Sequence, residues 1–394
     1  MNNQKFKVLV LDANQRSSLA VIRSLGSLDN VQIFTSDSTV KAIGGCSKYS
    51  QKYLRYPEIE KAPFAFLNWL EEVIKSLELD FLMPCTEMSS QIILMNRTLF
   101  EGTSIPFDTL ENVMAIADKS NLVNIARRID IASPKSIHYD RASDVDTLQF
   151  TQYPIVIKPS RSLIWNGMNC KQTEVKIAKN KVDLERILTT YRWLESNPFM
   201  IQEFIEGHGA GVFALYDKGK PVAFFSHKRL REKPPQGGVS VVSTSTPLNP
   251  NLLGNAKKLL DNVKWHGVAM VEFRVTNDGT PYLMEVNTRF WGSLQLAIDA
   301  GVDFPRLLFR ISNNEKVELE NNYRIGAKLR WFLGDFDSLY LVLKSNDYSL
   351  KTKIKRIMSF LKPDFVNTKH QVARRNDWRP GIEELKQYLN ALTK

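Results

Sequence analysis

The sequence has few cysteines and no long apolar run. Its three cysteines, Cys46, Cys85 and Cys170, are widely spaced among 394 residues. That spacing supports neither a disulfide framework nor a metal-ligand motif, so a reducing compartment is expected. The first apolar run, "VLVL" at 8–11, is too short for a signal-peptide core, and no later run reaches the roughly 18 apolar residues of a membrane helix. We therefore expect a cytoplasmic protein that makes no stable insertion into a membrane.

Acidic residues are in the minority, with 42 Asp and Glu against 53 Lys and Arg and a net charge of +11. Such a balance suits nucleic-acid or anionic-lipid binding, and equally an enzyme that handles phosphates. The basic residues are spread along the chain, with a mild excess at 351–362, and no nucleic-acid-binding fold signature accompanies them. We therefore expect no nucleic-acid partner, and contact of a basic helix at 351–361 with anionic lipid stays open.

The N-terminal part alternates strands and helices but lacks a dinucleotide-binding turn. Apolar runs at 6–11, 31–34 and 80–84 indicate strands, and helical spacing occurs at 62–77. This alternation predicts a parallel sheet covered on both faces. The turn after the first strand, "DANQRSS", contains no glycine, which argues against a nicotinamide cofactor.

After about residue 108 the pattern changes to a mixture of strands, hairpins and helices. Asp108 and Glu111 resemble a capping box that opens a helix. Strands are expected at 153–160, 174–178 and 199–205, helices at 181–193 and 251–263, and a hairpin at 211–229 that turns at Lys218-Gly219. Beyond about 312 the sequence becomes basic and helical.

The segment 268–290, "VAMVEFRVTNDGTPYLMEVNTRF", consists of two alternating runs around Asp278-Gly279. This dipeptide predicts a two-residue hairpin turn. The turn places Glu272 directly opposite Glu285 on the neighbouring strand. Because side chains alternate between faces, Asn287 and Arg289 share that face, and so does Arg274.

Two directly opposed carboxylates repel each other. One explanation is a solvated sheet face on which Arg274 and Arg289 form ion pairs with them. The other is a divalent cation between Glu272 and Glu285, with Asn287 as a third oxygen ligand. One-sided oxygen ligation is how proteins usually hold Mg²⁺, the other positions going to water and phosphates. The arginines would then serve phosphate oxygens or a developing oxyanion.

At this point the sequence resembles the ATP-grasp superfamily of carboxylate ligases. The resemblance covers residues 6–312 and rests on motifs in the family's order: "ADKS", "YPIVIKPS", "IQEFIEG", "VEF…MEVNTR" and "RFWGSLQLAIDAGVDFP", the last as in carbamoyl-phosphate-synthetase-like members. It implies ATP and Mg²⁺ or Mn²⁺ as cofactors. The residues implied to bind them are Lys119, Lys158, Gln202, Glu203, Ile205 and His208 for the nucleotide, and Glu272, Glu285 and Asn287 for the metal.

Two segments depart from the family pattern. The flap after the phosphate lysine, 160–169, contains one glycine and a tryptophan, so Arg161 is left as an alternative phosphate ligand. Gly209 stands where many members have a ribose-binding glutamate, and the choice between Glu206 and His208 as its replacement stays open.

The resemblance also implies an architecture. We expect an α/β protein with an N-terminal parallel-sheet pre-ATP-grasp domain at 1–115. An ATP-grasp domain of α+β type with antiparallel sheets follows at 116–312, its nucleotide-clamping subdomain at about 120–205. A basic helical C-terminal extension occupies 313–394.

The implied activity is that of a carboxylate-amine ligase. ATP activates a substrate carboxylate as an acyl phosphate, which an amine or similar nucleophile then displaces. No Ser-His-Asp or Cys-His pattern occurs, which agrees with a reaction driven by positioning and charge neutralisation. A catalytically silent or regulatory ATP-binding protein is the alternative. The identities of the carboxylate and the nucleophile are not fixed, and a homodimer is left open.

The segment 227–245, "HKRLREKPPQGGVSVVSTS", has two interpretations. It is either an exposed basic loop or a substrate loop in which Arg231 and Ser240 contact an anionic substrate. Arg289 and Arg274 complete the predicted catalytic set, and we expect Arg289 to act mainly in the chemical step because it lies two residues beyond Asn287.

Overall fold

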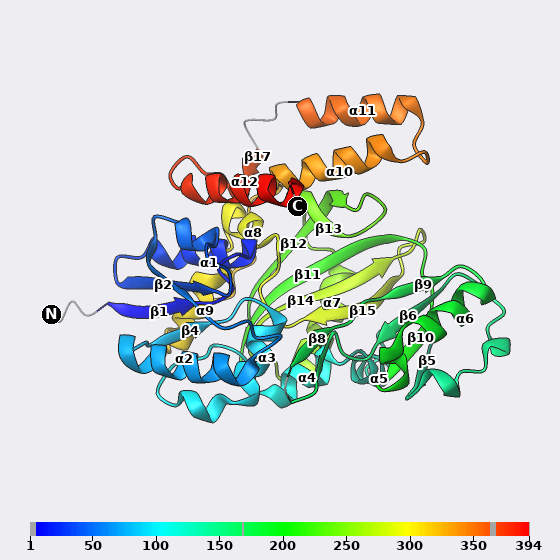
Figure 1. Ribbon diagram of the computed structural model, residues 1–394, viewed down its shortest axis with the longest axis horizontal. Helices are drawn as coiled ribbons and strands as arrows, with labels where there is room; N and C mark the ends of the chain where they lie inside the picture. Colours follow the sequence, from blue (N-terminus) through cyan, green and yellow to red (C-terminus); the bar gives the residue numbers. More distant parts are fainter. Residues whose placement is uncertain (1–4, 168, 363–367, 394) are drawn as a thin grey trace.

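Figure 1 shows the protein as a computed structural model, which describes residues 5–167, 169–362 and 368–393. The N-terminal part carries a four-stranded parallel sheet of order β3-β2-β1-β4. Its elements are β1 (Phe6–Val10), α1 (Arg16–Gly26), β2 (Val31–Asp37), β3 (Ser50–Arg55), α2 (Pro63–Leu77), β4 (Phe81–Met83) and α3 (Glu87–Met95). The predicted parallel sheet is therefore confirmed.

Strand β1 shows why this sheet is covered on both faces. Val8 and Val10 belong to the core cluster that contains the apolar residues of α1. Leu9 and Leu11 belong to the cluster that contains those of α2. Alternating side chains of one apolar strand thus reach two cores, as expected for a buried parallel strand.

Helices α4 (Leu110–Ala117) and α5 (Lys119–Arg128) connect this sheet to the rest of the chain. The predicted capping box at Asp108 and Glu111 is wrong by one residue. Thr109 is the N-cap of α4, because its side chain accepts a hydrogen bond from the Asn112 amide. Asp108 instead accepts hydrogen bonds from the amides of Thr109 and His266.

A second, antiparallel sheet has the order β5-β10-β6-β9. Its strands and helix are β5 (Ser136–Tyr139), β6 (Ile155–Pro159), β9 (Lys176–Ala178), α6 (Lys181–Thr190) and β10 (Phe199–Glu203). The flap forms a hairpin of β7 (Leu163–Trp165) and β8 (Cys170–Gln172), and Met168 within it lies outside the described residues. Trp165 Nε1 donates to Gln91 Oε1 of α3 at 3.2 Å, so the hairpin contacts the N-terminal part.

The third sheet has seven strands in the order β15-β14-β11-β12-β13-β16-β17. The strands are β11 (His208–Asp217), β12 (Lys220–Lys233), β13 (Val239–Ser245), β14 (Gly267–Val275), β15 (Pro281–Asn287), β16 (Lys328–Arg330) and β17 (Thr368–His370). Helices α7 (Pro250–Asn262), α8 (Leu294–Ala300) and α9 (Phe304–Ser312) belong to this part of the chain. The turn at Lys218-Gly219 lies where we expected it. The segment 227–245 is not a loop: it forms paired strands of β12 and β13 joined by a short turn.

Short 3₁₀ helices complete the described chain. They are η1 (Gly44–Cys46), η2 (Arg97–Phe100), η3 (Ala142–Asp144), η4 (Thr147–Gln149) and η5 (Arg192–Glu195). Within the described ranges, no helix is long and apolar enough to cross a membrane.

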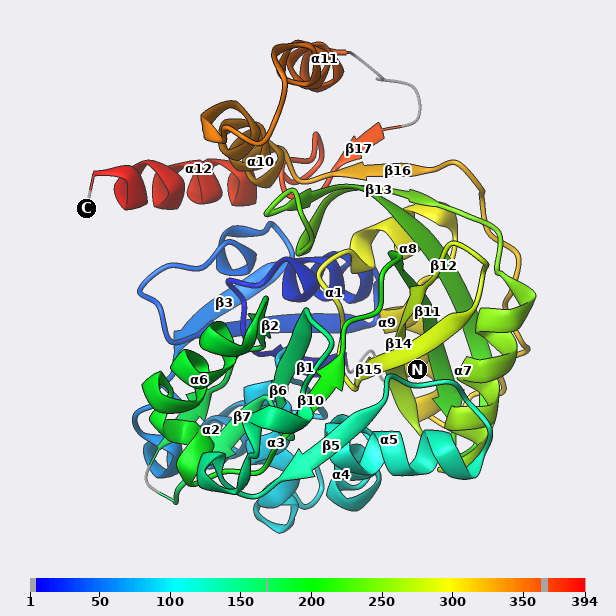
Figure 2. The same cartoon turned by 90° about the vertical axis from the view of Figure 1, so that its right-hand side faces the viewer.

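The sequence suggested a helical C-terminal part, but this part also contains two strands. Strands β16 and β17 extend the large sheet beyond β13. The helices are α10 (Phe332–Lys344), α11 (Leu350–Leu361) and α12 (Arg379–Leu392). In Figures 1 and 2, α11 lies at the outer edge of the molecule, with α10 between it and the sheets.

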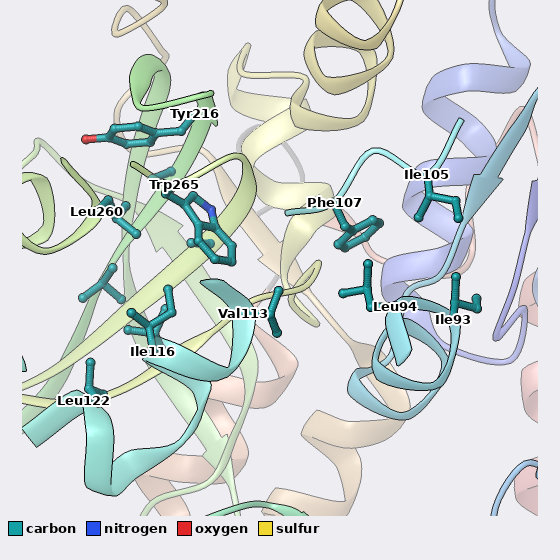
Figure 3. Packing of buried hydrophobic residues seen from close by; sticks show 14 of the residues in the cluster. Ile93, Leu94, Ile105, Phe107, Val113, Ile116, Leu122, Tyr216, Leu260 and Trp265 are labelled. Atoms are coloured by element: carbon teal, nitrogen blue, oxygen red, sulfur yellow. The ribbon is translucent and has the colours of Figure 1, made fainter. Parts of the chain in front are cut away.

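One apolar cluster runs from the N-terminal part into the large sheet (Figure 3). Ile93 and Phe107 lie at its N-terminal end, and Val113 of α4 leads towards Trp265, which precedes β14, and Tyr216 of β11. Trp265 and Tyr216 are almost completely buried. The shared core crosses the predicted boundary at residue 115, so the two parts are packed as one body, and the boundary itself stays a prediction.

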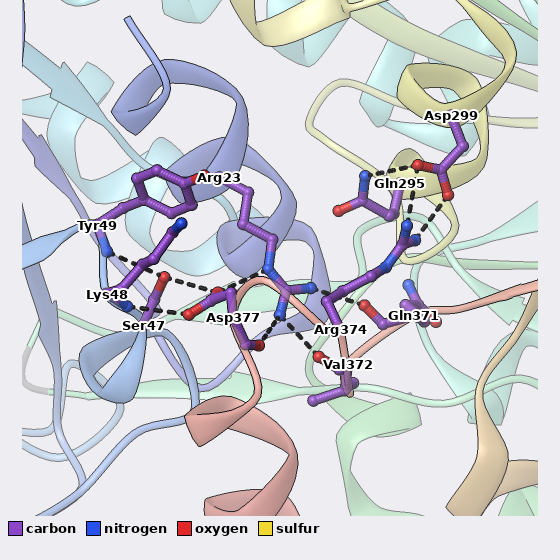
Figure 4. Close-up of polar contacts among 10 residues, drawn as sticks. All are labelled: Arg23, Ser47, Lys48, Tyr49, Gln295, Asp299, Gln371, Val372, Arg374 and Asp377. Atoms are coloured by element: carbon purple, nitrogen blue, oxygen red, sulfur yellow. Dashed lines mark hydrogen bonds and ion pairs between the residues drawn. The ribbon is translucent and has the colours of Figure 1, made fainter. Parts of the chain in front are cut away.

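A polar cluster near the C-terminus fastens the same two parts together (Figure 4). The Asp377 carboxylate accepts hydrogen bonds from Arg23 Nε and Ser47 Oγ, both at 2.8 Å, and from the Lys48 amide at 2.9 Å. Three residues earlier, Arg374 pairs with Asp299 of α8, with 2.6 Å between Nη2 and Oδ2. The segment 371–377 therefore joins the N-terminal sheet to the helices that follow the hairpin β14–β15.

Candidate active site

The hairpin β14–β15 pairs Glu272 with Glu285, as the sequence predicted. The two-residue turn is nevertheless wrong, because the Thr276 amide bonds to the Thr280 carbonyl at 3.1 Å and encloses a three-residue loop. A bulge between Glu272 and Phe273 shifts the register back by one residue. The two irregularities cancel, so the carboxylates lie opposite each other on one sheet face.

The amide of Asn287 lies between these carboxylates. Its Nδ2 is 3.1 Å from Glu272 Oε1 and 3.4 Å from Glu285 Oε1, and its Oδ1 accepts from Arg289 Nη2 at 3.2 Å. Burial, and then the charge of Glu285, raises the pKa of Glu272, while Arg229 counteracts this. Glu285 has no ion pair within the described residues. Among the described residues, Arg229 alone forms an ion pair with one of these carboxylates.

That cation, Arg229 of β12, is a functional candidate that the sequence interpretation missed. Its Nη2 lies 2.8 Å from Glu272 Oε2, although strand β11 separates β12 from β14. Gly209 of β11 lies beneath the guanidinium: a Cβ at this position would be 3.7 Å from Arg229 Nη1. That distance is an ordinary van der Waals contact, so Arg229 crosses the strand directly over Gly209.

Two lysines face the carboxylates from the other side. Lys158 of β6 is buried, and its ammonium group forms no hydrogen bond or ion pair within the part of the chain that the structure describes. Burial lowers the pKa of Lys158 to about 8, with Lys119 adding to this effect and Glu285 and Glu272 opposing it. Lys119, the first residue of α5, donates to Ser162 Oγ at 2.9 Å. A buried lysine without a partner favours binding of an anion.

A small cavity of about 20 Å³ lies at the centre of this group. Its lining includes Glu87, Lys119, Ser162, Glu285, Asn287 and Arg289. The structure therefore brings together six of the predicted residues: Lys119, Lys158, Glu272, Glu285, Asn287 and Arg289.

The predicted adenine segment begins in the last residues of strand β10 and continues beyond it. Gln202 Nε2 donates to Ser136 Oγ at 2.7 Å, and Glu203 Oε1 accepts from the Lys135 amide at 2.8 Å. The Ile205 carbonyl accepts a hydrogen bond from Arg274 Nε at 3.2 Å. Arg274 therefore supports this segment, which differs from the catalytic position predicted for it.

Other predicted residues lie apart from this group. Arg161 pairs with Asp118, the N-cap of α5, with 3.0 Å between Nε and Oδ2, and it is not among the described residues that line the small cavity. His208 begins β11 opposite Val275. By strand alternation its side chain points to the opposite face from Gly209 and Glu272.

Arg231 and Ser240 are also placed elsewhere. Arg231 Nη1 lies 3.2 Å from Asp335 Oδ2 of α10, and burial lowers the pKa of Arg231 to about 10. Ser240 Oγ is buried, without a hydrogen-bond partner in the described part of the chain. The structure therefore does not bring these two residues to the carboxylates.

A cavity of about 680 Å³ adjoins the small one. It lies at the carboxyl ends of the N-terminal parallel strands, where open α/β sheets usually bind ligands, and Leu163 and Gln172 of the flap help to line it. Glu87 and Arg289 line both cavities. A cavity of about 820 Å³ near Arg97 and His266 is larger but does not contain these residues.

Glu87 is a second candidate that the sequence interpretation missed. It is the first residue of α3 and follows strand β4. Burial raises the pKa of Glu87, while Arg289 and Lys119 counteract this. Its position directly after a buried parallel strand was the available indication, because such positions converge at one edge of the sheet.

The hairpin residues fit a hard divalent cation. Among the described residues, no group of three or more His, Cys, Asp and Glu side chains could hold a metal ion. Glu272, Glu285 and Asn287 instead supply two carboxylates and an amide from one side only. Mg²⁺ is commonly bound in this way, with water and phosphate oxygens completing its octahedron. This geometry does not provide a site in which protein side chains alone surround the ion.

Comparisons with known proteins show what the chain is similar to. A family model described as ATP-grasp in the biosynthetic pathway with Ter operon matches residues 195–332. A D-alanine--D-alanine ligase of Aquifex aeolicus is 24% identical over 275 residues, which are 63% of this chain and 91% of that protein.

Solved structures show the same fold at low identity. An L-amino acid ligase from Bacillus licheniformis has a TM-score of 0.60 and 15% identity over 78% of this chain and 74% of its own. The biotin carboxylase domain of a Hydrogenobacter thermophilus 2-oxoglutarate carboxylase has a TM-score of 0.65 and 17% identity, covering 82% of this chain and 74% of its own. The fold expected from the sequence is confirmed.

Proposed function

The protein contains an ATP-grasp domain within an ATP-grasp fold, and from this premise we propose that it is an ATP-dependent carboxylate-amine ligase. It activates a carboxylate as an acyl phosphate and couples it to an amine, releasing ADP and phosphate. The D-alanine--D-alanine ligase and the L-amino acid ligase bear the names of such enzymes. The biotin carboxylase domain is in complex with MgADP and bicarbonate, which supports MgATP as the cofactor of this chain.

The observation that carries the proposal is the shared wall between the two cavities. The small cavity collects the groups suited to Mg²⁺ and to the ATP phosphates, namely Glu285, Asn287 and Lys119. The large cavity has the volume for a second substrate. Glu87 and Arg289 line both, so a substrate in the large cavity meets the terminal phosphate at these two side chains.

The first step is the attack of a carboxylate oxygen on the γ-phosphorus, with ADP as the leaving group. Lys158 and Lys119 hold phosphate oxygens, and bound Mg²⁺ would neutralise the charge that develops on them. Arg289 donates to the substrate carboxylate and then to the oxyanion of the tetrahedral intermediate. No protein nucleophile is required, because the phosphorylated carboxylate is itself the activated species.

In the second step an amine attacks the acyl carbon, and phosphate leaves. Glu87 lies where the two cavities meet. Its carboxylate interacts electrostatically with Arg289 and Lys119. We assign it the binding of the incoming amine, because a carboxylate accepts hydrogen bonds from its N–H groups and can take up the proton that the nitrogen loses as it attacks. Arg289 and Glu87 thus divide the two substrates by charge.

The experiment is a phosphate-release screen of the purified protein with MgATP and pools of carboxylates and amines. We expect release that needs one carboxylate and one amine together, and mass spectrometry of that reaction identifies the product. With an oxygen-18-labelled carboxylate, one labelled oxygen should appear in the released phosphate, as an acyl phosphate requires. Release that is independent of both pools would contradict the proposal.

The matched variants are Glu285→Gln and Glu315→Gln. Glu315 is an exposed glutamate that pairs with Arg310 far from the carboxylate pair in sequence. Glu285→Gln should abolish release without lowering the melting temperature, because it removes a repulsion with Glu272. Glu315→Gln should retain full activity. An active Glu285→Gln protein would refute the metal assignment while leaving the fold untouched.

A further inference from the structure

Helix α11 exposes an apolar stripe that the proposed ligase activity does not use. Leu350, Ile354, Ile357, Met358 and Leu361 occur at intervals of four, three, one and three residues, which places them on one helix face. Their exposed fractions lie between 38% for Ile357 and 74% for Leu350. None of the twelve residues of α11 is buried. A stripe of this length on the exposed side of a helix indicates a contact surface.

The opposite side of α11 explains how the helix is held. Phe360 packs against Phe332 and Phe336 of α10, with ring centroids 5.7 and 6.3 Å apart. Arg356 Nη2 bonds to Asp335 Oδ1 of α10 at 2.6 Å. These contacts use positions that face away from the apolar stripe. Figures 1 and 2 both place α11 outermost, so the stripe lies open at the edge of the molecule.

Lysines border this stripe, and acidic residues are absent. Lys351, Lys355 and Lys362 are exposed, and on a helix of 3.6 residues per turn they lie along one edge of the stripe. The sequence 350–362 contains no Asp or Glu. The combination of an apolar stripe and a basic edge is typical of helices that lie in the surface of an anionic membrane.

A basic cavity of about 420 Å³ opens at the C-terminal end of α11. The described residues that line it include Arg231, Arg330, Lys362 and His370, and none of the described lining residues is a carboxylate. Arg330 Nη2 donates to the Phe360 carbonyl at 3.0 Å and Arg330 Nε to Asp335 Oδ2 at 2.7 Å. The buried Asp335 is shared by three arginines, since Arg231 and Arg356 also pair with it. One carboxylate cannot neutralise three guanidinium groups, so positive charge is in excess among the described side chains around Asp335, beside the cavity.

We propose that α11 and this cavity dock the protein on an anionic phospholipid surface. The apolar stripe enters the headgroup region, the lysines lie over anionic lipids, and the cavity accepts a headgroup phosphate. A second copy of the chain fits this surface less well, because a two-fold interface would oppose the same lysines. Nucleic acid would satisfy the charge but would leave the apolar stripe in water.

The test is flotation of the full-length protein with phosphatidylcholine vesicles that contain or lack phosphatidylglycerol. We expect binding only to the anionic vesicles, weakening as salt rises. Lys351→Ala should reduce binding about fivefold, the contribution of one lysine near a charged membrane. Met358→Glu should reduce it roughly tenfold or more, through loss of apolar contact and charge repulsion. Both residues are exposed, so both variants should fold.

The matched controls are Lys258→Ala on α7 and Val182→Glu on α6, which change exposed residues on other helices. Both should bind vesicles like wild type. Replacing chloride by inorganic phosphate at equal ionic strength should not release the protein, because free phosphate does not replace the apolar contact. Release by phosphate would show a site for a soluble anion and overturn the proposal.

Other outcomes would also overturn it. Equal binding to neutral and anionic vesicles, or equal loss in the control variants, would remove the role of α11. A concentration-dependent dimer of the wild type that Met358→Glu abolishes would assign the stripe to a second copy. Vesicle-independent retention on nucleic acid, lost in Lys351→Ala but kept in Met358→Glu, would assign the lysines to that polymer.

Discussion

Arg229 and Glu272 form an ion pair across an intervening strand, with 2.8 Å between Nη2 and Oε2. The side chains are each 22% exposed, so water screens the pair only in part. The Glu272 carboxylate is one of the proposed metal ligands, and in the metal-free protein Arg229 neutralises its charge. Arg229 therefore competes with a divalent cation for the same negative charge.

Arg229→Met tests this competition. We expect the metal-free variant to melt at a lower temperature than wild type, by an amount corresponding to about 1–3 kcal/mol, because a half-buried carboxylate loses its charge partner. Added Mg²⁺ should raise the melting temperature more in the variant than in wild type. Thermal denaturation across a magnesium titration measures both effects.

The double variant Arg229→Met/Glu272→Gln supplies the control. Without either charge, the extra effect of Mg²⁺ should disappear. If Mg²⁺ raised the melting temperature equally in wild type and Arg229→Met, the arginine and the metal would occupy independent positions.

Lys158→Met should separate ATP affinity from stability. Burial lowers the pKa of Lys158 from 10.5 to about 8, so the unfolded chain binds this proton over a range in which the folded chain does not. Stability of the wild type should therefore rise between pH about 8 and 10.5. Below pH 8 the full cost of roughly 3 kcal/mol is present.

Lys158→Met lacks the titrating amine. Urea denaturation should therefore show that the variant is more stable than wild type at neutral pH, and that its stability does not rise as the pH increases from about 8 to 10.5. Fluorescent-nucleotide titration should show weaker ATP binding. Unchanged nucleotide affinity in Lys158→Met would leave Lys158 without a role towards ATP.

Arg289→Lys should bind MgATP about as well as wild type but turn over more slowly. The guanidinium contacts the Asn287 amide oxygen and the Phe290 carbonyl, and pairs with neither carboxylate. Loss of a donor to charge that develops in the transition state typically costs on the order of 10²–10³ in rate. A lysine offers a point charge in place of the planar fork.

Melting temperature, ATP affinity and kcat measured on the same Arg289→Lys preparation decide the role. A variant that is destabilised and binds Mg²⁺ poorly, with kcat intact, would make Arg289 a structural support of the hairpin.

Asp377→Asn should strongly destabilise the protein. The carboxylate is buried and accepts from Arg23, Ser47 and Lys48, and the neutral amide leaves the Arg23 guanidinium without its counter-charge. Breaking such a buried pair typically costs about 3–5 kcal/mol. Urea denaturation measures the loss.

The comparison is Glu58→Gln, which breaks the exposed ion pair with Lys61. An exposed pair contributes little to stability because water screens it, so this variant should unfold at nearly the same urea concentration as wild type. Equal effects of the two substitutions would mean that the contact at Asp377 does not hold the domains together.

Local patterns in the sequence predicted much of the candidate site. Alternation around Asp278-Gly279 placed Glu272 opposite Glu285, and apolar strand context singled out Lys158 as a lysine in need of an anion. These inferences needed only neighbouring residues along one or two strands. The register of the hairpin was right because a bulge compensated for the wrong turn length.

Contacts between distant strands could not be predicted in the same way. A regular hairpin around the two-residue turn at Lys218-Gly219 would pair Arg229 with His208. A bulge between Leu215 and Tyr216 shifts the register by one residue. Arg229 therefore lies beside Gly209. One residue of slip reverses the face of a side chain. Arg231 was misassigned for a related reason: the bulges after Arg229 redirect it towards Asp335, which is more than 100 residues away in sequence.

The contact between Arg23 and Asp377 also bears on how the chain folds as it is synthesised. The two residues are separated by 354 positions, so the N-terminal sheet leaves the ribosome long before its carboxylate partner exists. During that interval the guanidinium of Arg23 and the hydroxyl of Ser47 have to be satisfied by water, and contacts of such large separation form slowly. Nascent chains interrupted before residue 371 would carry an N-terminal sheet that cannot complete its hydrogen bonds, which makes them recognisable targets for chaperones and proteases.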